Sequence, residues 1–165
     1  MPPRVGAASL HPAGEDSVAS LPWQRSIERA LAISARSGKP IFVDFTGYTC
    51  VNCRWMEKRV FAQGPVLDAL QNQFVLVQLY TDGGSDGEKN QRLQVERFRT
   101  LALPYYVILA PDDAVLATHA GILPSVSGFL DFLAQGTRST ALSAPGTERL
   151  APVALPASRL PAGAG

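Results

Sequence analysis

Runs of apolar residues divide the chain into candidate strands. The runs 41–45, 74–79 and 105–109 are continuous, as in strands that are buried on both faces. A turn at 111–113, which contains Pro and two Asp residues, predicts a fourth strand over 114–120 that returns antiparallel to the third. Helical segments separate the first two runs, which predicts a right-handed βαβ unit with parallel strands.

Helical periodicity fills the segments between the strands. Trp23, Ile27 and Leu31 recur every four residues, which predicts an amphipathic helix over about 21–36 with Ser20 as its N-cap and Trp23 in the core. Further helices are predicted over 51–61, 65–72, 88–99 and 124–136, the last of them ended by Gly136.

These elements predict an α/β fold in which a mixed four-stranded sheet is flanked by helices, one of them N-terminal. Strand 41–46 is expected at the centre, between 74–80 and 105–110, with 114–119 at an edge. Length allows one domain, which we place at 20–136. Residues 1–19 are expected to form a flexible arm and residues 137–165 a disordered Ala/Pro-rich tail, since neither shows hydrophobic periodicity.

The two cysteines of the chain, Cys50 and Cys53, lie where the first strand passes into a helix. Unpaired backbone N–H groups and the dipole at a helix N-terminus favour an anion, so the pKa of the Cys50 thiol is expected to fall and its sulfur to become nucleophilic. Cys53 follows one turn later and can close a small disulfide with Cys50.

Two acidic residues accompany the cysteines. Asp44 interrupts the first apolar run, and burial should raise its pKa, so we interpret it as a proton acceptor beneath the cysteines. The alternative is that Asp44 faces solvent or caps a turn. Glu57 lies four residues after Cys53 and shares its helix face, with a solvated surface position as the alternative.

Composition excludes several other classes of protein. With 15 basic and 14 acidic residues and no basic block, nucleic-acid binding is not supported. Two cysteines are no framework for a disulfide-rich fold, and His11 and His119 are too far apart to complete a metal site. No apolar run approaches the ~20 residues that span a bilayer, and no signal peptide opens the chain as given.

Several segments together carry a family resemblance. The segment Val-Asp-Phe at 43–45 followed by Cys-Val-Asn-Cys at 50–53 resembles the active-site strand and redox motif of thioredoxin-like proteins. Further segments narrow the resemblance to the C-terminal thioredoxin-like domain of the DsbD thiol:disulfide interchange (cytochrome c biogenesis) family. They are Arg54–Glu57, Val60–Phe61, Val66–Leu67, Phe74–Val77 and Leu79–Asp82. The resemblance covers roughly residues 23–133.

The resemblance implies a thioredoxin-like fold and roles for particular residues. Asp44 matches the buried acid, and Glu57 matches an acid that modulates the cysteine pKa. Gln78 stands where thioredoxins usually carry a lysine. The Leu103–Pro104 bond should be cis, although a trans proline at a strand start is the ordinary case. The residues expected to contact a partner are Tyr48, Thr49, Leu103, Pro104 and Gly121.

The expected function is that of a protein-disulfide reductase, which passes electrons by dithiol–disulfide exchange through a redox-active Cys50–Cys53 pair with no other cofactor and no metal. Its partners would be protein disulfides and an upstream electron donor, possibly a DsbD-type membrane domain, and a monomer is expected. Such a domain would be periplasmic. The alternatives are a cytoplasmic thioredoxin-like reductase, if the chain is complete as given, and a non-enzymatic binding or redox-sensor module.

Overall fold

The computed structural model describes residues 15–143 and contains a four-stranded mixed sheet. Its strands are β1 (Ile41–Thr46), β2 (Val75–Tyr80), β3 (Tyr105–Leu109) and β4 (Val115–Ala120), in the spatial order β2-β1-β3-β4. β1 pairs parallel with β2 and antiparallel with β3, which in turn pairs antiparallel with β4. The predicted sheet, with the first strand inside it and the fourth at an edge, is therefore confirmed.

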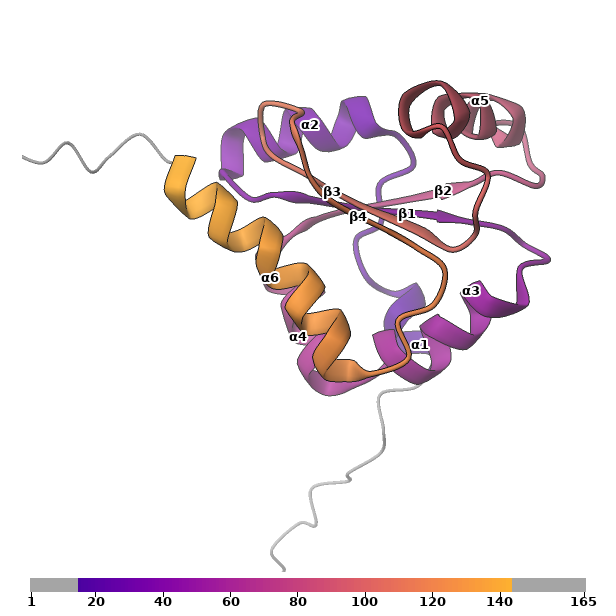
Figure 1. Ribbon diagram of the computed structural model, residues 1–165, viewed down its shortest axis with the longest axis horizontal. Helices are drawn as coiled ribbons and strands as arrows, with labels where there is room; N and C mark the ends of the chain where they lie inside the picture. Colours follow the sequence, from indigo (N-terminus) through magenta and orange to yellow (C-terminus); the bar gives the residue numbers. More distant parts are fainter. Residues whose placement is uncertain (1–14, 144–165) are drawn as a thin grey trace, which may run out of the picture.

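Helices cover both faces of this sheet (Figure 1). One face carries α2 (Ile27–Ser37) and α5 (Gly87–Phe98). The other carries α1 (Glu15–Ala19), α3 (Val51–Met56), the π-helical turn η1 (Glu57–Phe61), α4 (Gly64–Gln73) and α6 (Val126–Ser143). Within the described residues, no helix is both long and apolar enough to cross a bilayer.

The core on the α3–α6 face is built around Phe42 of β1. Its ring is fully buried and lies 5.6–6.4 Å, centroid to centroid, from five other aromatic rings. These rings belong to Trp23, Phe61, Phe74, Tyr106 and Phe129. Phe61 belongs to η1 and Phe129 to α6, so their contacts with Phe42 pack these two helices against β1. Trp23 therefore packs against the core, as predicted.

The prediction that a helix starts after Ser20 is wrong. α2 begins at Ile27, where the Ser26 side chain accepts a hydrogen bond from the Arg29 N–H and caps the helix. The preceding segment runs beside β2 instead, with Gln24 in a parallel bridge to Val77. Its backbone groups are paired with the edge of the sheet, so they are not available for helical hydrogen bonds.

Both predicted flanks contain helical residues. Part of the expected arm, residues 15–19, forms α1, because Val18 is buried against the aromatic core. At the other end α6 does not stop at Gly136 but continues to Ser143. A Cβ at Gly136 would overlap the Ile108 side chain, so this glycine permits close approach of α6 to β3. The remainder of the arm and the tail, with His11, lies outside the described residues.

We predict that Gly136→Ala lowers the free energy of unfolding by about 1 kcal/mol. The gain in helix propensity is about 1 kcal/mol, whereas overpacking against Ile108 costs about 1–3 kcal/mol. Urea unfolding measures the difference. The matched control is Gly64→Ala at the start of α4, where a Cβ meets no atom within 4 Å, so stability should hold or rise. A more stable Gly136→Ala protein would contradict the close-approach explanation.

Candidate active site

The two cysteines form a disulfide at the junction of β1 and α3. Their Cα atoms are 5.3 Å apart. Cys50 is the N-cap of α3, and its Sγ accepts a hydrogen bond from the Cys53 N–H at 3.2 Å. Cys53 is only 2% exposed, whereas Cys50 is partly open to solvent. An incoming thiol or disulfide can therefore reach Cys50 but not Cys53.

The strand register brings the other predicted partner-contact segments to the same edge of the sheet. β1 ends where β3 begins, since Phe45 pairs with Tyr105, and Tyr105 pairs in turn with Ala120 at the end of β4. The residues just outside these pairs are Pro104 and Gly121, and the Gly121 N–H donates to the Pro104 carbonyl at 2.8 Å. The Leu103–Pro104 bond is cis, as expected.

Several side chains near the disulfide are exposed. Tyr48 is 58% exposed and Thr49 is also open to solvent, while Leu103 and Gly121 are half-buried and Pro104 is buried. Val51, between the cysteines, is 80% exposed. The geometry thus places the five predicted residues on or beside one surface, and their contact with a partner stays a prediction.

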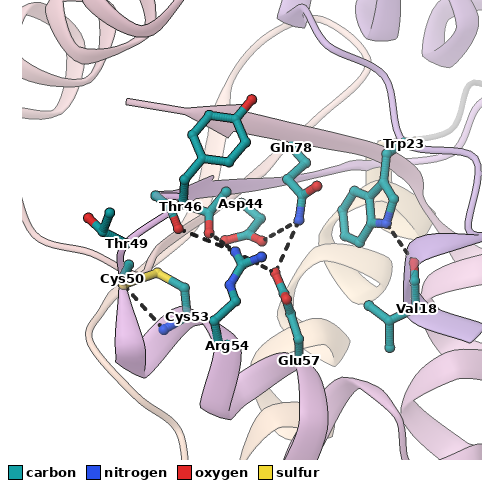
Figure 2. A network of polar contacts seen from close by, with 12 residues as sticks. Val18, Trp23, Asp44, Thr46, Thr49, Cys50, Cys53, Arg54, Glu57 and Gln78 are labelled. Atoms are coloured by element: carbon teal, nitrogen blue, oxygen red, sulfur yellow. Dashed lines mark hydrogen bonds and ion pairs between the residues drawn. A yellow bond between two sulfur atoms is a disulfide. The ribbon is translucent and has the colours of Figure 1, made fainter. Parts of the chain in front are cut away.

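Asp44 is buried beside the disulfide, with 2% of its surface exposed, so the solvent-facing alternative is wrong (Figure 2). Burial first, and then the nearby charge of Glu57, raise the pKa of Asp44 to about 7, although the Gln78 hydrogen bond and the Arg54 cation lower it in part. Its Oδ1 has no hydrogen-bond partner among the described residues, whereas Oδ2 accepts from Gln78 Nε2 at 3.4 Å. The carboxyl can therefore take up a proton near neutral pH.

Glu57 joins the same group of side chains through Gln78 and Arg54 (Figure 2). Gln78 Nε2 also donates to Glu57 Oε1 at 3.3 Å, so one amide nitrogen serves both carboxylates. Arg54 Nη2 lies 2.9 Å from the same Glu57 oxygen. With 15% of its side chain exposed, Glu57 is not the solvated residue of the alternative interpretation.

Comparison with known proteins identifies the scaffold that carries this geometry. A family model described as thioredoxin-like matches residues 22–111. The chain belongs to the thioredoxin-like family. It therefore has the thioredoxin-like disulfide oxidoreductase fold with a Cys50–Cys53 pair.

Individual relatives agree with this assignment. Over 70 residues the chain is 37% identical to the thiol:disulfide interchange protein DsbD 2 of Pseudomonas aeruginosa. The aligned residues are 42% of this chain and 12% of that protein. The chain thus spans only a small part of that relative. A thioredoxin from Thermus thermophilus is 24% identical, with a TM-score of 0.62 over 79% of this chain and 97% of its own.

The C-terminal domain of DsbD from Neisseria meningitidis, in its oxidised form, superposes with a TM-score of 0.56 at 16% identity, over 66% of this chain and 90% of its own. At these identities the two solved structures support the shared fold. The expected likeness to DsbD is therefore confirmed in sequence and in fold.

Arg54 is a residue of this thioredoxin-like site that sequence reasoning missed. Its Nη2 donates to Thr46 Oγ1 at 2.9 Å as well as pairing with Glu57, and its guanidinium lies 5.8 Å from the centre of the Tyr80 ring. Arg54 therefore joins the end of β1 to the helix that carries Cys53. Its position directly after the second cysteine was the available signal.

Asp82 was also missed, and it holds the loop before Cys50. Its carboxylate accepts from the Tyr48 N–H at 2.7 Å, the Thr49 N–H at 2.9 Å and the Thr49 hydroxyl at 2.8 Å. These hydrogen bonds hold the pKa of Asp82 below its ordinary value, and the bond from the Thr49 N–H has the largest effect. No sequence signal pointed to them, because the partners are more than thirty residues apart.

The described residues contain no group of three His, Cys, Asp or Glu side chains that could hold a metal ion. His119 instead packs edge-on against Phe132, with ring centroids 6.2 Å apart.

We predict that Asp82→Asn lowers the melting temperature at neutral pH and that this difference shrinks as the solution becomes acidic. Because the folded-state pKa is lowered, the stabilisation is complete above the ordinary pKa of 3.8 and is lost as pH falls through the folded value. Thermal unfolding from about pH 7 to about pH 3 measures it. Asp86→Asn is the control, since the Asp86 side chain makes no cap hydrogen bond. A difference that stays constant with pH would contradict this role.

We also predict that Asp44→Asn becomes progressively more stable than the wild type as pH rises from about 4 to about 7. In this window folded Asp44 keeps a proton that the unfolded chain releases, since its pKa is raised from 3.8 to about 7. The wild type therefore loses up to about 1.4 kcal/mol per pH unit, and the variant does not. Urea unfolding of the disulfide form measures the difference. Asp131→Asn, an exposed position on α6, should show no such trend.

Proposed function

We propose that this protein is a protein-disulfide reductase that works by dithiol–disulfide exchange. The observation that carries the proposal is the pairing of a solvent-accessible Cys50 with a buried Cys53 beside a carboxyl group whose pKa is about 7. The first sulfur is open to a partner, and the second has a proton acceptor nearby.

In the first step the Cys50 thiolate of the reduced protein attacks a disulfide of the partner. A Cys50–partner bond forms, the partner's S–S bond breaks, and the released partner sulfur takes up a proton. The Cys53 N–H, which donates to Cys50 Sγ in the disulfide form, stabilises the thiolate of the reduced form as well.

In the second step Cys53 transfers its thiol proton to Asp44 and attacks Cys50. The Cys50–Cys53 bond forms, the mixed disulfide breaks, and the second partner sulfur leaves as a thiol after protonation. The partner gains two electrons and the protein ends as the observed disulfide. Glu57 and Arg54 adjust this proton transfer because their charges shift the Asp44 pKa in opposite directions.

The reducing direction rests on the dipeptide between the cysteines. Val51 and Asn52 include no histidine that would strongly stabilise the Cys50 thiolate. A strongly stabilised thiolate makes a pair oxidising, so this pair should be a reductant. Similarity to a thiol:disulfide interchange protein supports an upstream electron donor for this protein. Our candidate for that donor is a DsbD-type membrane domain, with this protein on the periplasmic side.

Partner contact is assigned to the surface around Cys50. Tyr48 and Thr49 would form one side of it, and Leu103, Pro104 and Gly121 the other. The exposure of Tyr48 and Val51 supports an apolar contact with an extended partner segment.

The reduction potential of the Cys50–Cys53 pair tests the proposal. Equilibration with glutathione or dithiothreitol buffers should give a value of about −200 to −270 mV. A value near about −120 mV would reverse the direction and indicate a disulfide donor. The absence of any reversible couple would favour a non-enzymatic binding module.

A second experiment, in which the mixed disulfide is trapped, separates thiol–disulfide exchange from simple binding. Cys53→Ala should accumulate a covalent adduct with insulin as a model disulfide protein, because the resolving sulfur is gone. The control Cys50→Ala should form little adduct, since Cys53 is buried.

A further inference from the structure

A row of side chains at matched strand positions reaches from Asp44 to the edge of the sheet. Gln78 is the register partner of Asp44 in the β1–β2 pair. Beyond β2, Gln24 forms a parallel bridge with Val77, which places Arg25 beside Gln78. Side chains at matched positions of neighbouring parallel strands point to the same face.

Two backbone hydrogen bonds fix the segment that carries Arg25. The Gln24 N–H donates to the Leu76 carbonyl at 2.7 Å, and the Gln78 N–H donates to the Gln24 carbonyl at 3.0 Å. Arg25 Nη1 in turn donates to Gln78 Oε1 at 3.0 Å, and its guanidinium lies 5.5 Å from the centre of the Tyr80 ring. Arg25 is thus held against the amide from the side opposite the carboxylates.

We propose that Arg25 is a positioning residue that fixes the orientation of the Gln78 amide, so that its nitrogen always faces Asp44 and Glu57. A guanidinium can only donate hydrogen bonds, so the amide oxygen must face Arg25. The amide nitrogen is then left to donate to Asp44 Oδ2 and Glu57 Oε1. The amide nitrogen has two hydrogens, one for each carboxylate, and both bonds are long, at 3.4 and 3.3 Å.

The orientation matters because a carboxyl group changes from acceptor to donor when it takes up a proton. A free amide could rotate its oxygen toward protonated Asp44 and accept from the acid, which would stabilise the neutral form. With Arg25 on the oxygen, Gln78 can only donate, and donation favours the ionised form. Arg25 therefore keeps the pKa of Asp44 lower than a freely rotating amide would.

Other groups also face Asp44 and must be separated from this effect. Glu57 and Arg54 reach it from η1 and α3, and buried Tyr106 is its register partner on β3. Arg25 is exposed, so solvent screens its charge, and it acts through the hydrogen bond to Gln78. Because the Arg25 side chain is exposed, its removal should leave the fold intact.

The consequence for function rests on the proposed role of Asp44 as acceptor of the Cys53 proton. An Asp44 that stays protonated at neutral pH cannot accept that proton, so loss of Arg25 would slow the second step of exchange. The test below reads the Asp44 carboxyl directly in the disulfide form. The proposed role of Arg25 can therefore fail this test while the reductase proposal stands. Equally, the role of Arg25 can pass it if the reductase proposal fails.

The experiment follows the Asp44 side-chain carboxyl by carbon-13 NMR as pH is varied. Arg25→Met should raise the Asp44 pKa by roughly half a unit to one unit. Arg29→Met, which removes an exposed arginine four residues along the chain, is the matched charge control and should leave the titration unchanged. Gln78→Met should also raise the pKa, because it removes the hydrogen bond that favours the ionised carboxylate.

The double variant Arg25→Met with Gln78→Met completes the cycle. If Arg25 acts through Gln78, the double variant titrates like Gln78→Met alone. An Arg25→Met titration that matches the wild type would overturn the proposal. So would an Arg25→Met shift that persists unchanged without Gln78, or an equal shift in Arg29→Met, since either would indicate a direct charge effect.

Discussion

Burial of Asp44 in an inner strand, next to the disulfide, is the constraint on which the site depends. An ionised carboxylate in that position is costly, and among the described residues only one of its oxygens has a hydrogen-bond partner. The result is a group that exchanges its proton near neutral pH rather than one that is simply ionised. β1 carries the acid and leads through the loop 47–49 to Cys50 at the start of α3, so one short stretch of chain connects acid and sulfur.

The polar groups around Asp44 are tolerated because they form a narrow row across an otherwise apolar face. Phe42, two residues before Asp44, anchors the aromatic cluster on the same side of the sheet. Gln78 and Glu57 supply the contacts that the carboxylate would otherwise lack, and Arg54 balances the second negative charge. The segment before α2 extends this row by pairing with β2, and its Arg25 contacts both the Gln78 amide and the Tyr80 ring.

The arrangement separates two tasks in space. The surface that we propose for partner contact lies at the sheet edge that carries Pro104 and Gly121, beside the partly exposed Cys50. The proposed proton transfer would take place inside, among the buried groups around Asp44. Asp82 links the two, because it holds the loop that leads from β1 to Cys50 in a fixed conformation. The thioredoxin-like scaffold thus keeps Cys50 accessible to solvent while Asp44 stays buried.

The sequence by itself determined the strands, their order, the disulfide pair and the buried acid. Those features are local: apolar runs predict burial, and the Cys-x-x-Cys spacing at a strand–helix junction predicts its own chemistry. Only the tertiary structure decided that Arg25 contacts Gln78, which lies 53 positions away in the sequence. It also decided that Asp82 holds residues 48 and 49, which lie 34 and 33 positions away. The same holds for Gly136, a stop signal by local rules, which the packing of α6 on β3 turns into a point of close contact. Periodicity states which side chains are buried, but strand register decides which of them meet.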